Sequence, residues 1–295
     1  MAEKLVLAVT TPERLGALSI GRLRKRIGLC RVSTVTADGN TAAYILRNAV
    51  DAVVLDLPAS CPEAQALLNA CREMNVTVYN AEAAVLYGAR TPSAAALFVK
   101  RMFDVIGSVM GLLLTGLVFL VVAPQLRRKS PGPVFFAQER VGRNGRRFTL
   151  YKFRTMCVDA EAQKAALLPQ NKMRGPLFKV DHDPRIIPGI GTFLRKTALD
   201  ELPQMWNVLR GEMSLVGTRP PTVEEFEQYT YRHKSRLAAK PGITGVWQVS
   251  GRNKVTDFEE VVRLDNEYIV GWRFARDVKI LLKTVLVVLR SQGTA

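Results

Sequence analysis

Hydrophobic and polar positions divide the 295-residue chain into stretches with different periods. In the first 90 residues, short apolar runs alternate with a segment of helical period, CPEAQALLNACREM at 61–74. The runs are LVLAVT at 5–10, DAVVLDL at 51–57 and VTVYN at 76–80. This alternation predicts a small parallel α/β domain. Because TTPERLG rather than G-x-G-x-x-G follows the first run, we expect residues 1–90 to be Rossmann-like but without a dinucleotide motif, in a structural or regulatory role.

A second stretch, Val105–Leu126, reads VIGSVMGLLLTGLVFLVVAPQL and contains no charged residue. As a helix it would extend over roughly 33 Å, which matches the hydrocarbon core of a bilayer. The alternative is a buried helix of a protein core, but such helices are usually shorter and have a polar face. The pattern therefore predicts association with a membrane.

Basic residues lie on both sides of this apolar stretch: Lys100, Arg101, Arg127, Arg128 and Lys129. A helix that crosses the membrane once normally has its basic residues on one side. Potential helix breakers lie within it: Gly107, Gly111, Gly116 and Pro124. We therefore expect residues 91–129 to form a linker and a helix–break–helix that re-enters on the face where it began. A full span is the alternative.

The segment SPGPVFFAQERVGRNGRRFTLYKFRTM at 130–156 follows, with two strand-like runs around a turn at Gly142–Gly145. Its charges are almost all basic. Alternate residues of a strand share a face, so Lys152 and Arg154 are expected on the same side. The segment is either a solvated cationic surface against the membrane, or at least one of these two side chains contacts an anion.

The amino-acid composition limits the classes of molecule that the protein is expected to bind. Lys and Arg number 42 against 26 Asp and Glu, a formal net charge of +16. This balance suits nucleic acid, an anionic membrane surface or phosphorylated substrates. No RNP or helix-turn-helix pattern is evident, so nucleic acid is not expected. The four cysteines have no C-x-x-C spacing and indicate reduced thiols rather than zinc or disulfides.

The third feature is the stretch KTALDELPQMWNVLRGEMSLVGTRPP at 196–221. Asp200 and Glu201 stand side by side in an otherwise apolar pattern, at the expected start of a helix. Carboxylates and phosphates are both stabilised there, and Pro203 is tolerated in a first turn. Arg219 follows in a proline-rich turn that suits bidentate contact with a phosphate. The plainer alternative is that the acidic pair faces solvent.

Several stretches together carry a family resemblance: KRMFDVIGS, SPGPVFFAQERVGRNGRRF, YKFRTM, FLRKTALDELPQMWNVLRGEMSLVGTRPP and KPGITGVWQVSGRN. From Lys100 to about Arg290 the chain resembles the bacterial sugar transferases, polyprenyl-phosphate hexose-1-phosphate transferases of the monotopic phosphoglycosyl transferase superfamily. The α/β part resembles the extra domain of the larger members. Those members usually begin with several transmembrane helices, which are missing here, so we expect a truncated sequence or a shorter natural form.

The resemblance implies transfer of a hexose 1-phosphate from a UDP-sugar to polyprenyl (undecaprenyl) phosphate, with release of UMP. Asp200 would be the nucleophile, forming an aspartyl-phosphosugar intermediate, and Glu201 would assist; both would bind Mg²⁺. The residues matching the family's phosphate-binding positions are Lys152, Arg195, Arg219 and Arg252. Residues 130–295 would form a mostly helical α+β catalytic domain on the cytoplasmic face of the bacterial inner membrane, as an early step of exopolysaccharide, capsule or O-antigen assembly.

Two positions depart from the family pattern. Gly217-Thr218-Arg219-Pro220 replaces Gly-Pro-Arg-Pro, and Thr115-Gly116 replaces the Ser-Pro that commonly breaks the membrane helix. A non-enzymatic scaffold that recruits partners to anionic lipid is the alternative function. Nothing in the sequence selects the sugar, and a homo-oligomer stays open.

Other conspicuous residues receive plainer interpretations. The histidines are expected at the surface, and Asp181 and Asp183 in a polar loop rather than at a metal. Trp247 and Trp272 are expected to pack in the core or at an interface. Residues 277–291 have the pattern of an amphipathic helix, packed in the core or lying on a membrane surface.

Overall fold

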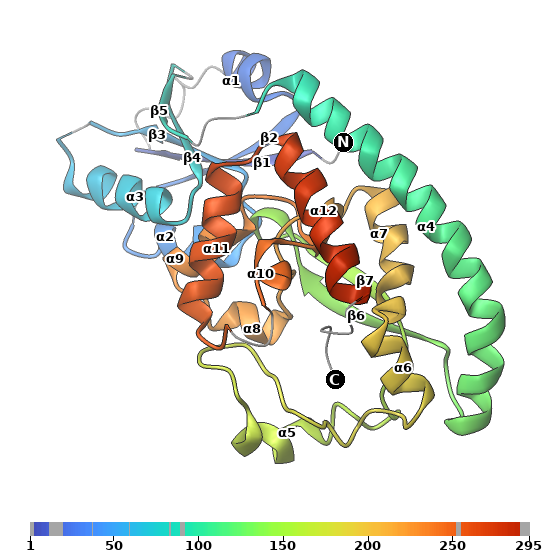
Figure 1. Ribbon diagram of the computed structural model, residues 1–295. Coiled ribbons are helices and arrows are strands. Elements are labelled where there is room, and N and C mark those ends of the chain that lie inside the picture. The colour runs from blue at the N-terminus through green and yellow to red at the C-terminus, as the bar shows by residue number, and fades with distance from the viewer. Residues whose placement is uncertain are drawn as a thin grey trace. The chain divides into compact units, whose positions relative to one another are not determined.

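The computed structural model describes residues 3–11, 20–36, 38–58, 60–82, 84–88, 92–251 and 255–289 (Figure 1). The chain divides into two compact units. The first contains Met1–Thr91, Arg143–Arg146 and Tyr229–Ala239, and the second contains Pro92–Gly142, Arg147–Gln228 and Lys240–Ala295. Two short segments from later in the chain thus join the N-terminal region, which the sequence pattern did not predict.

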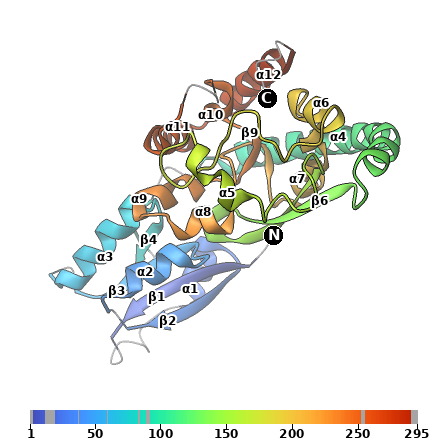
Figure 2. The same ribbon diagram turned by 90° about the horizontal axis from the view of Figure 1, so that it is seen from below.

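The first unit is built on a five-stranded sheet in the order β2-β1-β3-β4-β5 (Figure 2). Neighbouring strands from β2 to β4 pair in parallel, and β5 is antiparallel to β4. The parallel α/β prediction for the N-terminal region is therefore confirmed. Its elements are β1 (Lys4–Thr10), α1 (Ile20–Ile27), β2 (Cys30–Val35), α2 (Thr41–Arg47), β3 (Ala52–Asp56), α3 (Pro62–Glu73), β4 (Thr77–Asn80) and β5 (Val85–Tyr87).

Alternation along β1 explains why both faces of this sheet are covered. Leu7 and Val9 belong to one buried cluster, with Leu67 of α3. Val6 and Ala8 belong to a second buried cluster on the opposite face. Strands buried on both faces read as continuous apolar runs, which is why LVLAVT lacks a polar side.

The later segments of the first unit are fastened by polar contacts. They contain η2 (Arg143–Gly145), α9 (Tyr231–Lys234) and η5 (Ser235–Leu237). The Nζ of Lys234 donates to the Leu46 and Asn48 carbonyls, both at 2.9 Å, and to the Ile45 carbonyl, where α2 ends. The carboxylate of Asp51 accepts from Arg146 and, at 2.8 Å, from the Nδ2 of Asn144. The charges of Lys234 and Asp51 are thus satisfied by groups of the same unit.

The second unit combines helices with two small sheets, an antiparallel β6–β7 hairpin and a parallel β8–β9 pair. Its mostly helical character agrees with the expected α+β architecture. Its elements are α4 (Ala94–Lys129), β6 (Phe135–Val141), β7 (Arg147–Phe153), α5 (Lys164–Leu167), η3 (Leu168–Gln170), α6 (Ile190–Lys196), η4 (Leu199–Gln204), α7 (Met205–Arg210), β8 (Ser214–Val216), α8 (Val223–Glu227), β9 (Gly242–Thr244), α10 (Val246–Val249), α11 (Phe258–Val270) and α12 (Phe274–Leu289).

The break expected within the apolar stretch is absent. Helix α4 is continuous from Ala94 to Lys129, with Pro124 inside it, and Figure 1 shows it curving along one side of its unit. The glycines act as contact points instead. A Cβ on Gly107 would lie 2.6 Å from Leu215 Cδ1, and one on Gly111 would lie 2.5 Å from Met205 Cγ. A larger residue at Gly107 or Gly111 would require Leu215 or Met205 to move, because these side chains approach the helix so closely.

One face of α4 is anchored to the rest of the second unit by polar groups. Asp104 is buried and accepts hydrogen bonds from Ser214 Oγ and Leu215 N, both at 2.9 Å. Arg101 donates to the Val208 and Leu209 carbonyls at 2.7 Å, near the C-terminal end of α7. Such groups favour one fixed orientation of the helix because each leaves a buried polar atom unpaired if it shifts.

The opposite face of α4 is apolar and exposed, as at Met110, Leu113, Leu117 and Leu120. The helix is long and apolar enough to cross a membrane by length and composition, with a mean hydropathy of 2.6 over its most apolar window. An exposed apolar surface of this extent marks a site of contact with lipid or another molecule.

Candidate active site

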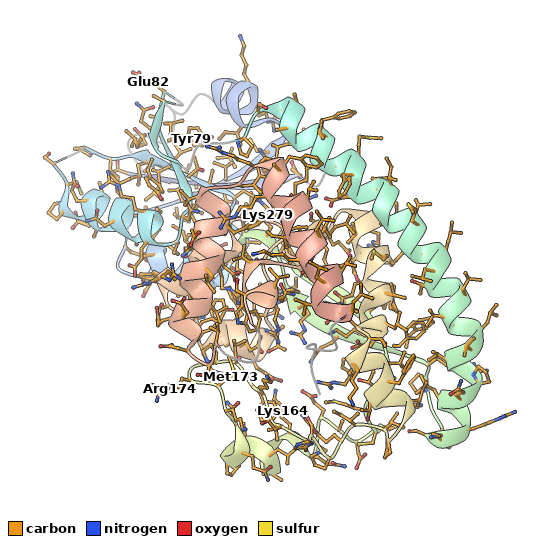
Figure 3. The ribbon with its side chains drawn as sticks, viewed as in Figure 1. Tyr79, Glu82, Lys164, Met173, Arg174 and Lys279 are labelled. Atoms are coloured by element: carbon orange, nitrogen blue, oxygen red, sulfur yellow. The ribbon has the colours of Figure 1, made fainter. Side chains whose placement is uncertain are left out.

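A cavity of about 440 Å³ opens in the second unit. Its wall is made by the β6–β7 hairpin, the segment between β7 and α6, the start of η4, the turn after β8 and the region around α10. Lys164 and Met173, labelled in Figure 3, belong to this wall. Five of the six predicted site residues line it, namely Lys152, Arg195, Asp200, Glu201 and Arg219; Arg252 lies outside the described residues.

The acidic pair lies in the first turn of η4, as the sequence predicted, although this turn is a 3-10 helix rather than an α-helix. Ala198 precedes the pair in the left-handed conformation at φ 55°. A non-glycine residue adopts this conformation only where its surroundings hold it. Asp200 is 9 % exposed and lies in the cavity wall. The backbone of this turn thus places Asp200 in the cavity wall.

Glu201 does not stand alone beside Asp200. Its Oε1 accepts a hydrogen bond from the Nζ of Lys152 at 2.9 Å. Lys152 lies on β7 directly opposite Phe136 of β6. The ion pair is partly exposed, so its net contribution to stability is small, at most about 1 kcal/mol. The ion pair matters because it places the positive charge of Lys152 next to the acidic pair.

Arg219 is held by a bidentate ion pair. Its Nη1 and Nη2 donate to Glu225 Oε2 and Oε1 at 2.9 Å and 3.2 Å. Glu225 also accepts from the backbone N of Thr222 at 2.9 Å, completing a capping box at the start of α8. Burial alone would raise the pKa of Glu225, but the charges of Arg219 and Arg140 hold this pKa below its usual value. The carboxylate therefore stays ionised and fixes the guanidinium on the cavity wall.

Arg140 is a member of this cluster that the sequence argument did not single out. Its Nη1 donates to the Pro220 carbonyl at 3.1 Å, and its Nε donates to Gln138 Oε1 at 3.0 Å. Burial, and then the neighbouring charge of Arg219, lower the pKa of Arg140 to about 10. Two guanidinium groups close enough to repel one another form a site that an anion would stabilise.

The remaining basic residues differ in what they can do. Arg195 ends α6 and lines the cavity. Arg154 also borders the cavity, but its guanidinium donates to Ser130 Oγ at 3.1 Å and to the Ser130 and Pro131 carbonyls. It therefore fixes the chain after α4. Of the two side chains expected on one face of the strand, Lys152 is placed for an anion and Arg154 is engaged by the backbone.

The donor set for a cation is limited. No group of three or more His, Cys, Asp or Glu side chains that could hold a metal ion occurs in the part of the chain that the structure describes. Asp183, for example, is paired with Arg185 at 2.6 Å in a buried contact. Asp200 and Glu201 are adjacent carboxylates on a fixed turn of the cavity wall. This set fits Mg²⁺ only if water or substrate oxygens complete the coordination.

Trp247 lies in the core, as expected, and is 5 % exposed. It also borders the cavity, and its Nε1 has no hydrogen-bond partner among the described residues. Trp272 is half-buried and donates from Nε1 to Asp277 Oδ2 at 3.0 Å. Asp277 in turn pairs with Lys100 of α4. Trp272 thus belongs to the attachment of α12 to α4.

Three residues that organise this unit were not predicted although the sequence contains signals for them. Thr222 and Glu225 have the T-x-x-E spacing of a capping box, which predicts a helix start just after the arginine turn. Asp104 is the acidic residue nearest the apolar stretch, and an isolated carboxylate in such a place indicates a buried partner. The bidentate contact between Glu225 and Arg219 has no sequence signal, because it depends on the turn between them.

The sequence matches a known protein family. The family model described as "Bacterial sugar transferase" matches residues 95–291. The chain is 51% identical over 221 residues to the "Galactosyl transferase CpsE" of Streptococcus agalactiae serotype III, covering 75% of this chain and 49% of that protein. It is 39% identical over 197 residues to the "UDP-glucose:undecaprenyl-phosphate glucose-1-phosphate transferase" of Klebsiella pneumoniae, covering 63% of this chain and 39% of that protein.

A shorter relative is covered almost completely. The chain is 38% identical over 199 residues to the "Exopolysaccharide production protein ExoY" of Rhizobium meliloti, covering 66% of this chain and 87% of that protein. The chain therefore spans about half or less of the longer relatives and most of this shorter one. The matched region contains the whole cavity wall described above.

Proposed function

Because the chain belongs to the bacterial sugar transferase family, we propose that it transfers a hexose 1-phosphate from a UDP-sugar to a polyprenyl phosphate. UMP would be the other product. The observation that carries this proposal is the joint placement, on one cavity wall, of the Asp200 carboxylate and a cluster of cations around Arg219. Phosphoryl transfer needs a nucleophile and positive charge in this proximity.

The cations would bind the diphosphate of the donor. Arg219, fixed by Glu225, presents a planar guanidinium suited to two phosphate oxygens. Arg140 adds a second guanidinium beside it, and a bound phosphate would relieve the repulsion between the two. Lys152 and Arg195 complete the positive wall. Their charges would stabilise the negative charge that develops on the UMP oxygen as it leaves.

Asp200 would act as the nucleophile. Its carboxylate oxygen would attack the phosphorus that bears the sugar, and the bond from this phosphorus to the UMP oxygen would break. The phosphosugar would then be held as an acyl phosphate on Asp200. A phosphate oxygen of the polyprenyl phosphate would attack the same phosphorus, releasing Asp200 and forming the polyprenyl diphosphate sugar. Using one site twice keeps the two anionic substrates from occupying it together.

Glu201 would position rather than attack, because its carboxylate is engaged by Lys152. We propose that Asp200 and Glu201 hold Mg²⁺ together with substrate oxygens. When bound, this ion would neutralise charge on the diphosphate. Lys152 would orient Glu201 and offset its charge, so that the acidic pair carries less net negative charge toward an incoming anion.

The exposed face of α4 would lie among lipid acyl chains on the cytoplasmic side of the inner membrane. The opposite face packs along the catalytic part through Asp104, Gly107 and Gly111. A straight crossing would therefore carry the charged cavity into the bilayer, where charged groups are costly. We propose that α4 enters one leaflet and that both basic flanks stay on the cytoplasmic side, without the helix break expected from the sequence.

Helix α12 would support this placement. Val278, Leu282, Leu286 and Leu289 are exposed along it, and Lys279, labelled in Figure 3, stands beside them. An apolar face with flanking lysines is typical of helices that lie on an anionic membrane surface.

The test is transfer by purified protein in detergent or nanodiscs with Mg²⁺, undecaprenyl phosphate and a panel of UDP-sugars. UDP-galactose and UDP-glucose come first, because the names of the relatives include both galactosyl and glucose-1-phosphate transferases. We expect release of UMP and formation of a lipid-linked sugar with at least one donor. Release of UDP instead of UMP, or no transfer from any donor, would contradict the proposal.

A further inference from the structure

An aromatic strip connects the lipid-facing helix to the cavity. The ring of Phe135 on β6 stacks on Phe119 of α4 with centroids 5.5 Å apart, and on Phe153 of β7 with centroids 5.3 Å apart. All three residues belong to the second unit. Phe135 and Phe153 also line the cavity. The strip is therefore a continuous apolar path from the membrane helix to the wall that carries the catalytic groups.

This path is partly open. Phe135 is 42 % exposed although it lies between two rings, and its neighbour Phe136 is 41 % exposed. Both side chains border the cavity. Two adjacent exposed phenylalanines are unfavourable in water, because each leaves a large apolar ring uncovered. An apolar ligand that covers them would recover that free energy.

The residues at the polar end of this path indicate the chemistry of the ligand's head group. Phe136 lies directly opposite Lys152 across the β6–β7 hairpin, so these side chains share a face. Lys152 is bonded to Glu201, next to Asp200. Phe135, the preceding residue of the strand, belongs to the opposite face of the hairpin with Phe153, yet both rings border the cavity. A ligand whose chain passes from Phe135 over Phe136 would thus place its head group at the cations and its tail toward α4. The arrangement fits an amphiphile with an anionic head and a long apolar chain.

We propose that Phe119, Phe135 and Phe136 form a subsite for the isoprenoid chain of the polyprenyl phosphate, between the lipid-facing side of α4 and the cavity. The inference rests on the proposed function for the identity of the head group. It adds the residues that guide the lipid substrate to Asp200. Isoprene units are branched and unsaturated, so their methyl groups and double bonds pack well on aromatic faces.

The uracil of the nucleotide donor is the main rival occupant, because a base also stacks on exposed rings. The wall near Phe135 favours the lipid, since this ring continues into the apolar contacts of α4 through Phe119. A base needs hydrogen-bond partners for its polar edge, whereas an isoprenoid chain needs only a continuous apolar surface. The two occupants make opposite predictions for substrate affinity.

Steady-state kinetics distinguish them. We expect the double variant Phe135→Leu/Phe136→Ala to raise the KM for undecaprenyl phosphate about tenfold, consistent with the loss of one or two aromatic contacts. The KM for the UDP-sugar and the lipid-independent release of UMP should stay unchanged. Phe193→Ala is the matched control, because Phe193 is 52 % exposed on α6 and does not line the cavity. A double variant that behaves like this control, or that raises only the KM for the UDP-sugar, would overturn the subsite.

A binding experiment on the unchanged protein makes the inference independent of folding and of turnover. A polyprenyl phosphate with a diazirine in its first isoprene units should label the peptides containing Phe119 or Phe135 and Phe136. Excess undecaprenyl phosphate should compete, whereas UMP and phosphatidylglycerol should not. Labelling confined to other segments, or competition by UMP, would refute the subsite. Specific labelling of a protein that shows no transfer would refute the proposed function and leave the lipid site standing.

Discussion

The two units of the molecule differ in what they leave uncovered. In the first unit, apolar strand residues are buried on both faces of the sheet, and the buried charge of Lys234 is satisfied by three backbone carbonyls. In the second unit, the apolar face of α4 is exposed, and cations gather around a cavity that they do not fill. The first arrangement buries its apolar residues and pairs the charge of Lys234. The second is suited to lipid and phosphate, and we propose that the chemistry takes place there.

The largest expected effect is that of replacing Asp200, the proposed nucleophile in the second unit. Asp200→Asn keeps the size of the side chain but replaces the carboxylate with an amide, a far poorer nucleophile, so turnover should fall by more than about a hundredfold. Tryptophan fluorescence during unfolding should stay as in the unchanged protein. Asp181→Asn is the control, because Asp181 is exposed, pairs with Lys172 on the surface and does not line the cavity. Comparable activity in the two variants would remove Asp200 from the mechanism.

The next effect concerns the arginine that Glu225 holds. Arg219→Lys keeps the charge but loses the planar fork, and we expect kcat/KM for the UDP-sugar to fall roughly 10- to 100-fold. Arg210→Lys is the control, since Arg210 makes an exposed pair with Glu212. Glu225→Gln should give a smaller loss than Arg219→Lys, because the guanidinium remains but is less firmly placed. If Glu225→Gln were the more harmful change, Glu225 would act on substrate directly.

A smaller effect tests how α4 is attached. Gly111→Val should lower the free energy of unfolding of the second unit by about 1–3 kcal/mol, because the new side chain meets Met205. Gly116→Val should change it by less than about 0.5 kcal/mol, because a Cβ at Gly116 meets nothing within 4 Å. All three tryptophans, Trp206, Trp247 and Trp272, belong to the second unit, so their fluorescence reports on it selectively. Equal effects at the two glycines would contradict the packed orientation of the helix.

The last prediction concerns the buried charge of Lys234 in the first unit, whose effect is at most about 1.4 kcal/mol for each pH unit. Burial lowers the pKa of Lys234 from 10.5 to about 7. Between these values the unfolded chain binds more protons than the folded one, so the stability of the first unit should rise with pH, by at most about 1.4 kcal/mol per pH unit. Hydrogen exchange of the β1 and β3 amides should show this rise. The Lys234→Met variant should lack it, and an identical pH profile in that variant would contradict the assignment.

The sequence was sufficient where a local pattern decides the structure. Apolar runs predicted β1, β3 and β4 of the parallel sheet but not β2, and the placement of Asp200 and Glu201 in a first turn followed from the residues around them. It was insufficient where the outcome depends on distant partners. The glycines of α4 indicated a break, but Leu215 and Met205 occupy the space that they leave. Likewise, YKFRTM indicated two cations on one face, but Ser130 and Pro131 engage Arg154.

The boundary between the two units could not be predicted from the sequence for the same reason, because it depends on distant contacts. Residues 143–146 and 229–239 join the first unit through contacts with residues about 90 to 190 positions earlier, such as Asn144 with Asp51 and Lys234 with Leu46. Neither segment has a pattern that distinguishes it from its surroundings. A contact of this separation becomes visible only once the strands and helices are placed.

The most direct test of the central claim is the mass of the intact protein after incubation with a UDP-sugar in the absence of lipid. The account predicts an added hexose phosphate on up to one site per molecule, located on the peptide containing Asp200 and absent from Asp200→Asn. Adding undecaprenyl phosphate should remove the adduct and yield the lipid-linked sugar. An unmodified protein, together with intersecting rather than parallel initial-rate lines, would contradict the account and show direct transfer between the two substrates.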